Sequence, residues 1–305
     1  MNTPWLKGII ATTVTPFDER EEVDEVAFVE QVRYMLAAGV DGISVGGSTG
    51  EGAVLTDEEL SRLCALAVAE TDGRVPVVAG IIRNCTRDAL RTAKAVATTG
   101  VKALMITPVH YHVLAPGDEG NFKFYQKIAE EIGLPIIIYN VVPHNVISPE
   151  CLIKLADIPE IVAIKQSGGD IHKLAEMVQQ CGNRIIVMSA VDDLLFPTYV
   201  IGAQGSIVAP SAIIPELIVE QWQAYLRKDY QSAEVLHQRI LPVVQAISGV
   251  NFPAKIKEAI RQLGRSSGIT RSPGIEPTQS EKEKIRNALV AAGVLQPNCV
   301  SPTSM

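Results

Sequence analysis

Short apolar runs alternate with longer segments of helical period through most of the chain. The runs are largely continuous in apolar residues rather than alternating, which is typical of parallel strands covered on both faces. Between the first two runs, Val29, Val32 and Leu36 share one face of a helix with Val26. We therefore expect strands at residues 8–16, 41–46, 76–81, 103–107, 135–140, 161–166, 185–189 and 205–209.

The spacing of these predicted strands is that of a repeated strand–helix unit. Their starts lie roughly 20 to 35 residues apart, the length of one βα unit in an eight-stranded barrel. The sequence therefore predicts a (β/α)8 barrel, the TIM-barrel fold of class α/β, over residues 1–211. A doubly wound sheet is the competing fold, but it is usually marked by GxGxxG after the first strand. Residues 12–17 read TTVTPF there, and the glycine cluster at 46–52 has neither this spacing nor that of a P-loop.

Beyond residue 212 the strand pattern ends and only helical patterns remain. They cover residues 220–226, 230–247, 254–263 and 280–292, with a loop at 265–277 and a frayed tail at 296–305. No Gly/Ser-rich linker separates these helices from the barrel. Residues 212–305 are therefore expected to form a C-terminal helical extension packed on the barrel.

Composition places the chain among ordinary globular proteins and narrows its partners. It has 305 residues, 47% of them hydrophobic and 20% charged, which excludes a disordered chain and a coiled-coil rod. The formal net charge is −7, and no run of Lys or Arg is present. Nucleic acid and anionic membranes are therefore poor candidate partners, since binding their phosphates needs clustered positive charge.

Three further features predict a cytoplasmic protein. The five cysteines are scattered, without the CxxC spacing of a zinc site or the even count of a disulfide framework. Residues 194–215 carry no charge, but prolines and glycines divide them into short elements rather than a membrane span. The first residues, MNTPWLKG, lack the apolar region of a secretory signal.

Candidate chemistry is expected at the carboxyl ends of the strands, where the active sites of such barrels lie. Lys165 closes the apolar run 161–164, so its amine is expected among apolar walls at the barrel mouth. Desolvation disfavours an ammonium group and lowers its pKa, which yields the neutral amine that attacks a carbonyl group. A lysine that simply reaches solvent from a strand end has the same local pattern, and the run alone does not distinguish the two.

Two more strand ends carry polar groups suited to such a site. Tyr139 ends the strand before Lys165, and its phenol can relay a proton or serve only as a core aromatic. Ser48 and Thr49 lie in a glycine-flanked turn before a helix, where hydroxyls and backbone amides can hold a carboxylate without a cation. A tight turn with an incidental helix cap explains the same pair of residues.

Together these motifs resemble the dihydrodipicolinate synthase/N-acetylneuraminate lyase family of class I aldolases. The resemblance rests on GSTGE at 47–51, on Tyr139-Asn140 and on Ile164-Lys165. Residues 12–17, 202–207 and 251–255 extend it. It implies a (β/α)8 barrel with a C-terminal helical extension, assembled as a homotetramer or a homodimer. It also implies a lyase that takes pyruvate or another 2-oxo acid plus an aldehyde and uses no metal or other cofactor.

The resemblance implies a role for each matching residue. Lys165 would form a Schiff base with the 2-oxo acid, and Tyr139 would carry protons. Thr49 would link that phenol to a second tyrosine lent by a neighbouring subunit, and the main-chain carbonyl at Ile207 would line the pocket. The turn residues would hold the substrate carboxylate: Gly47, Ser48 and Thr49.

Two departures from the family pattern leave questions open. The second tyrosine belongs to a Pro-Tyr-Tyr stretch after the fourth strand, which here reads PVHYH at 108–112, so either Tyr111, shifted by one residue, or His110 takes its place. Synthases of the lysine precursor carry an arginine after Tyr-Asn-Val-Pro, but residues 139–145 read YNVVPHN and contain none. Arg83 is a candidate substitute for binding an anion, unless it is a solvated loop arginine.

Several functions are open on the sequence alone. The leading hypothesis is a lyase that cleaves or condenses a 2-oxo acid with an aldehyde through Lys165. A sugar-acid dehydratase would share its first steps, while 4-hydroxy-tetrahydrodipicolinate synthase itself is disfavoured by the missing arginine. A metal-dependent hydrolase using His110 and His112 is a further alternative, with Asp192 among its nearest partners. The last alternative is a protein of this type that binds its ligand without catalysis.

Overall fold

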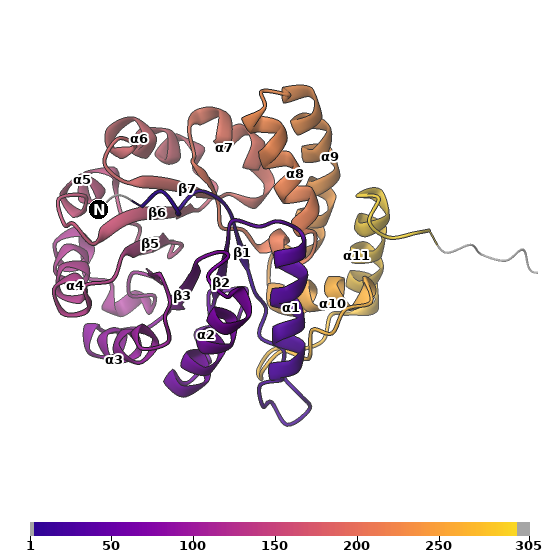
Figure 1. The fold of residues 1–305 in the computed structure, drawn as a ribbon, viewed down its shortest axis with the longest axis horizontal. Coiled ribbons are helices and arrows are strands. Elements are labelled where there is room, and N and C mark those ends of the chain that lie inside the picture. The colour runs from indigo at the N-terminus through magenta and orange to yellow at the C-terminus, as the bar shows by residue number, and fades with distance from the viewer. Residues whose placement is uncertain (1–2, 298–305) are drawn as a thin grey trace, which may run out of the picture.

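Eight parallel strands close into a barrel in the computed structural model, which describes residues 3–297. The strands pair in sequence order, and β1 (Gly8–Thr12) closes the ring against β8 (Gly205–Ser206). Between these two lie β2 (Gly42–Val45), β3 (Val77–Ile81), β4 (Ala103–Ile106), β5 (Ile136–Asn140), β6 (Ile161–Ser167) and β7 (Ile186–Ala190). Figure 1 shows the strands at the centre of the molecule with helices around them. The predicted (β/α)8 fold class is thus confirmed.

Helices follow the strands and form the outer layer of the molecule (Figure 1). The first eight are α1 (Glu25–Ala37), α2 (Asp57–Thr71), α3 (Thr86–Ala97), α4 (Gly117–Ile132), α5 (Pro149–Leu155), α6 (Ile171–Cys181), α7 (Leu195–Ile201) and α8 (Pro215–Leu226). The chain then adds α9 (Tyr230–Ile247), α10 (Phe252–Gln262) and α11 (Gln279–Ala291). Short 3-10 turns are η1 (His112–Leu114), η2 (Asp192–Leu194) and η3 (Ala209–Ala212). The helix predicted at 230–247 coincides with α9. The helix predicted from residue 220 begins earlier, at Pro215 of α8, because a proline is favoured in the first helical turn.

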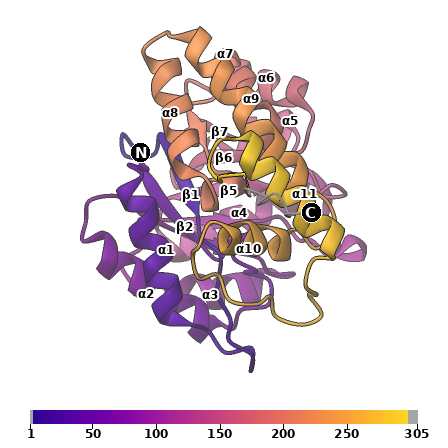
Figure 2. The ribbon, with the colours of Figure 1, turned by 90° about the vertical axis from the view of Figure 1, so that its right-hand side faces the viewer.

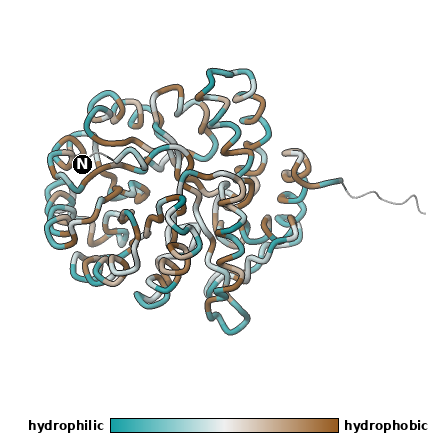
Figure 3. Tube along the Cα trace, in the orientation of Figure 1, coloured by the Kyte–Doolittle hydropathy of each residue, from teal (hydrophilic) through white to brown (hydrophobic). Residues whose placement is uncertain are grey.

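Two apolar layers explain why the strands read as continuous apolar runs. Met105 and Ile137 belong to the layer inside the barrel, and Leu104 and Ile138 belong to the layer between the barrel and its helices. Successive residues of a strand point to opposite faces, so both faces of each strand meet an apolar surface. In Figure 3 the strands are mainly brown, and the hydrophilic positions lie mostly along the outer helices.

β1 is shorter than predicted, because Thr15 and Phe17 form hydrogen bonds with segments outside the barrel sheet. The Thr15 hydroxyl donates a 2.7 Å hydrogen bond to the carbonyl of Gly50, in the loop after β2. Phe17 accepts a 2.9 Å backbone hydrogen bond from Ile269, in the segment after α10. The segment after β1 therefore ties the glycine turn and the C-terminal helices to the same end of the barrel.

The C-terminal helices pack on the barrel and on one another. α9 contacts α8 and α11, while α10 contacts η3 at the barrel end. Figure 2 shows α9, α10 and α11 from the side. Because α8 packs on β1 like the other ring helices, the division between residues 211 and 212 stays a prediction. From residue 298 on, the predicted tail lies outside the described residues. No helix within residues 3–297 is long and apolar enough to cross a membrane.

Candidate active site

The turn at residues 46–52 is rich in glycine because backbone segments meet there without room for side chains. Gly46 has a φ of 73°, which glycine adopts without strain. A Cβ atom on Gly80 of β3 would lie 2.6 Å from the carbonyl oxygen of Gly46, and one on Gly52 would lie 1.7 Å from it. The turn is therefore fixed against β3, and it leads into α2, which Thr56 caps.

Lys165 and Tyr139 lie side by side on neighbouring strands. They are paired in the register of β5 and β6, and Lys165 Nζ lies 3.8 Å from the centroid of the Tyr139 ring. Both residues are 5% exposed. The Tyr139 hydroxyl donates a 3.0 Å hydrogen bond to Oγ of Ser48, in the glycine turn. The structure thus brings three predicted residues, which we call the site trio, together at the carboxyl ends of the strands.

This arrangement suits nucleophilic chemistry on a carbonyl group. A lysine amine that lies buried beside an aromatic ring is held away from bulk water, as in Schiff-base lysines. The phenol next to it can give or take a proton at a group attached to the amine. The hydroxyl of Ser48 fixes the direction of that phenol.

The other predicted residues of the site lie around the trio. Thr49 is buried in the same turn, but the phenol's hydrogen bond goes to Ser48, rather than to Thr49 as the resemblance implied. Gly47 lies beside them, and its carbonyl accepts a backbone hydrogen bond that closes the turn. Ile207 follows β8 and is fully buried, and its N–H donates to the carbonyl of Ser189. That the carbonyl of Ile207 lines the pocket stays a prediction.

His110 and Tyr111 occupy different environments in the loop after β4. The ring of His110 contacts the side chain of Asn84 at 3.0 Å, and His110 lines the same cavity as Ser48. Tyr111 is 53% exposed and lies outside that lining. Within one chain, the structure therefore places His110 rather than Tyr111 near the site trio. Whether the Tyr111 of a neighbouring copy reaches the trio stays a prediction.

The two histidines of this loop do not have the geometry of a strand-borne metal site. β4 ends at Ile106, so His110 and His112 lie beyond the strand and do not alternate along one of its faces. His110 is partly buried, which lowers the pKa of its ring, whereas His112 is exposed. Within the part of the chain that the structure describes, no group of three or more His, Cys, Asp or Glu residues is placed to hold a metal ion. The metal-dependent hydrolase therefore loses the geometry on which it rested.

Asp192 is a residue of this site that sequence reasoning considered only as a metal partner. It opens η2 directly after β7. Burial raises the pKa of Asp192 to about 7, against the opposing charge of Lys165 and a hydrogen bond from the backbone N–H of Ala209. The carboxyl group thus gains or loses its proton near neutral pH, close to the site trio. The signal that could have found it is its place after a strand, which also marked Lys165.

Arg83 is engaged by protein partners and is largely buried. Its guanidinium group donates to the Asp57 carboxylate at 3.1 Å and to the Thr92 hydroxyl at 3.0 Å. It also donates to the carbonyl of Gly52, at the end of the glycine turn, and to that of Leu55, which follows the turn. Arg83 therefore fixes the segment that leads into α2 and is not free to replace the missing arginine. It is not a solvated loop residue either.

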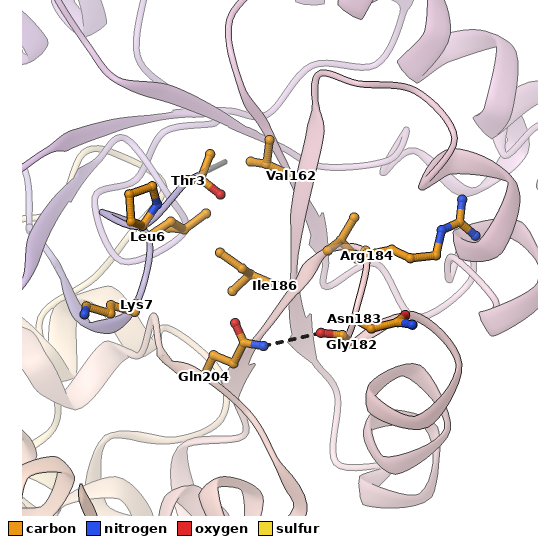
Figure 4. Close-up of a pocket in the computed structure, with 11 residues that line it drawn as sticks. Thr3, Leu6, Lys7, Val162, Gly182, Asn183, Arg184, Ile186 and Gln204 are labelled. Carbon is orange, nitrogen blue, oxygen red and sulfur yellow. Dashed lines mark hydrogen bonds between the residues drawn. The ribbon is translucent and has the colours of Figure 1, made fainter. Parts of the chain in front are cut away.

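Two of the cavities lie at opposite ends of the barrel. One, of about 380 Å³, opens beside Ser48 and the loops after β4 and β5. The other, of about 300 Å³, lies where β6 and β7 begin, and Figure 4 shows Val162, Ile186 and Gln204 around it. The side-chain amide of Gln204 donates to the carbonyl of Gly182 at 3.5 Å there. Because the starts of barrel strands mainly serve stability, the cavity beside Ser48 is the candidate binding pocket.

A buried lysine and tyrosine at the carboxyl end of a TIM barrel suit a lyase of the class I aldolase type. A sequence profile of the dihydrodipicolinate synthetase family matches residues 5–292. The chain belongs to this family, which confirms the resemblance seen in its motifs.

Known proteins resemble the chain over nearly its whole length. The 4-hydroxy-tetrahydrodipicolinate synthase of Methanopyrus kandleri is 33% identical over 294 residues, which are 95% of this chain and 97% of that protein. The crystal structure of a dihydrodipicolinate synthase from Bacillus anthracis has a TM-score of 0.88 and 31% identity, covering 93% of this chain and 97% of that one. The enzyme from Acinetobacter baumannii, complexed with pyruvate, has a TM-score of 0.89 and 28% identity, covering 95% of this chain and 100% of that one. These similarities establish the family and the class of enzyme, a lyase, but not its substrate.

Proposed function

We propose that this chain is a Schiff-base lyase that joins or splits an aldehyde and a 2-oxo acid, such as pyruvate. The observation that carries the proposal is the buried amine of Lys165, which lies 3.8 Å from the centroid of the Tyr139 ring. The hydroxyl of that tyrosine is hydrogen-bonded to Ser48. The pyruvate held by the related enzyme from Acinetobacter baumannii supports the choice of oxo acid. In the proposed reaction the lysine bond to substrate takes the place of a metal or other cofactor.

The reaction follows from the positions of these side chains. The Lys165 nitrogen attacks C2 of the oxo acid, and water leaves as the C=N bond forms. Tyr139 gives and takes the protons needed at the departing oxygen and at C3, with Ser48 as its hydrogen-bond partner. The enamine carbon C3 then bonds to the aldehyde carbon, whose oxygen takes up a proton. Water finally releases a 4-hydroxy-2-oxo acid from the lysine, and cleavage runs through the same steps in reverse.

The glycine turn supplies the proposed carboxylate site. Thr49 and the backbone amides around Gly47 lie next to Ser48, so the substrate carboxylate would meet hydroxyl and N–H donors there rather than a cation. The carbonyl of Ile207, after β8, would also line the substrate pocket. With the carboxylate held by the turn, C2 of the oxo acid would face the Lys165 amine.

Borohydride trapping tests the proposal directly. Reduction of the protein with pyruvate should add the mass of the reduced pyruvyl group to the peptide that contains Lys165. Lys165→Ala should abolish the adduct, and Lys154→Ala, which removes an exposed lysine of α5, should leave it unchanged. No mass gain, or a gain that survives Lys165→Ala, contradicts the proposed function.

Two related reactions are separated from the lyase by their products. A sugar-acid dehydratase would form the same Schiff base, but it would release water and no aldehyde. The relative from Methanopyrus kandleri is named 4-hydroxy-tetrahydrodipicolinate synthase. For that reaction this chain lacks an arginine at residues 139–145, and Arg83 is already paired with Asp57. We therefore place the lyase first.

Assembly and location remain part of the proposal. We propose a homodimer or homotetramer, supported by exposed apolar side chains on the loop after β4. We also propose a cytoplasmic location, supported by free thiols at each cysteine of the described part of the chain.

A further inference from the structure

We propose that the aldehyde partner of this site carries an apolar, uncharged substituent, such as an alkyl chain or an aromatic ring. The inference rests on the proposed lyase function and concerns the cavity that opens beside Ser48. That cavity has a volume of about 380 Å³, within the range of pockets that hold small molecules.

Apolar side chains from four separate parts of the chain form the wall of this cavity. Val54 comes from the segment before α2, Val141 and Val142 come from the loop after β5, and Pro253 comes from α10. The apolar wall is completed by Ala53, Ile82 and Pro143. Ser48 joins the wall to the site trio, so the apolar surface begins where the aldehyde would meet the enamine.

The cavity offers no lysine or arginine to an anionic aldehyde. No Lys or Arg is among the described residues that line it, and its acidic residue, Glu51, is paired with Lys257 at 2.5 Å. Burial lowers the pKa of His110, which favours the uncharged form of this ring. A carboxylate or phosphate on the aldehyde would therefore lose its hydration without gaining an ion pair with a lysine or arginine.

A polyhydroxylated aldehyde also fits this wall poorly. Each hydroxyl that leaves water needs a hydrogen-bond partner, and valine and proline side chains supply none. The Thr107 hydroxyl is buried and has no partner among the described residues, and His110 has one such ring nitrogen. The wall could thus match two polar groups of a ligand at most, but not a chain of hydroxyls.

A comparison of aldehydes in the pyruvate condensation tests the inference. Benzaldehyde and hexanal represent the apolar class, succinic semialdehyde the anionic class and glyceraldehyde the hydroxylated class. We expect kcat/KM to be at least about tenfold higher for an apolar aldehyde than for either of the others. Product formation is followed by mass spectrometry, and the KM for pyruvate should stay constant across the series.

Substitutions in the cavity wall test the same point from the protein side. His144 is exposed and lines the cavity, so His144→Arg adds a cation there, and kcat/KM for succinic semialdehyde should rise about fivefold without a gain for benzaldehyde. His172→Arg, at an exposed position of α6 outside the wall, is the matched control and should leave both values unchanged. Val142→Thr keeps the shape of the wall but makes it polar, and should raise the KM for benzaldehyde about fourfold.

Trapping of pyruvate separates a failure of this inference from a failure of the proposed function. If borohydride fixes pyruvate on Lys165 but succinic semialdehyde or glyceraldehyde is the preferred partner, the inference is overturned and the lyase stands. If no adduct forms on Lys165 in the wild-type protein, both are overturned.

Discussion

Among single residues, the hydrogen bond from Tyr139 to Ser48 gives the neighbouring hydroxyl groups of Ser48 and Thr49 different expected roles. Ser48→Ala removes the acceptor of that bond, so kcat should fall about 10- to 100-fold with a smaller change in the KM for pyruvate. Thr49→Val keeps the volume but removes a donor for the carboxylate, so it should mainly raise the KM for pyruvate. Steady-state kinetics measure this contrast, with circular dichroism as the check on folding. The opposite pattern would show that the proton relay runs through Thr49.

The carboxyl group of Asp192 predicts a dependence of stability on pH. Burial raises the pKa of Asp192 to about 7 in the folded protein, from an ordinary value of 3.8. Between these values the folded state binds more protons than the unfolded state, so the free energy of unfolding falls as the pH rises through this window. Asp192→Asn removes this loss and should raise the midpoint of thermal unfolding at pH 8 but not at pH 4. The same gain at both pH values would contradict the prediction.

Residue chemistry alone could not settle which turn hydroxyl meets the phenol. Lys165 and Tyr139 were predictable because each ends a strongly apolar run, and the ends of parallel strands meet at one edge. Ser48 and Thr49 are adjacent, and only the path of the backbone through the glycine turn decides that Ser48 faces Tyr139. Asp192 was missed as a member of the site because the rise of its pKa depends on how other elements cover the carboxyl group, which no local sequence pattern reports.

Among helices and strands, order and type followed from the sequence, whereas several ends did not. The apolar runs predict all eight strands because each strand is covered on both faces. β1 ends earlier than predicted because the Thr15 hydroxyl donates a hydrogen bond to the carbonyl of Gly50, in another loop. Hydrophobic patterning cannot indicate such a contact. The loop that carries His110 begins earlier than predicted for a related reason. The backbone N–H of His110 donates a hydrogen bond to the side chain of Asn84, in the neighbouring loop.

A buried ion pair connects α10 to the glycine turn and can be tested as a positioning contact. Lys257 is 1% exposed, and its amine contacts Glu51 and the carbonyl of Ile269. Lys257→Met leaves the Glu51 carboxylate buried without its partner, so the free energy of unfolding should fall by about 3 kcal/mol. The KM for pyruvate should also rise, because Glu51 belongs to the turn that would hold the carboxylate. Urea unfolding and steady-state kinetics measure the two effects.

The double variant Glu51→Gln/Lys257→Met is the control for this ion pair. It removes both charges, so most of the lost stability should return. Rescue of stability without rescue of the KM would show that the pair positions the turn as well as stabilising the fold. A Lys257→Met protein as stable as the wild type would contradict the expected cost of the unpaired carboxylate.

For the whole molecule, exposed apolar side chains on the loop after β4 favour association with a second copy. Tyr111 and Leu114 are each 53% exposed, and Val113 is 65% exposed. Burying such neighbouring apolar groups against another copy would remove them from water. In the proposed homodimer or homotetramer, the same contact would bring Tyr111 of one copy towards the site trio of the other, which the exposed Tyr111 does not approach within its own chain.

Leu114→Asp should therefore weaken association and activity together. A carboxylate buried in the interface would lose its hydration without gaining a charged or hydrogen-bonding partner. A dissociated chain would also lack the Tyr111 that its neighbour lends. We expect sedimentation to show a shift towards the mass of one chain, and specific activity to fall on dilution in step with the dissociated fraction. Val26→Asp, on an exposed position of α1, is the matched control and should change neither. A Leu114→Asp protein that is monomeric yet fully active would show that the trio works without a neighbour's residue, and His110, which lines the cavity of its own chain, would then be the remaining candidate for the second relay group.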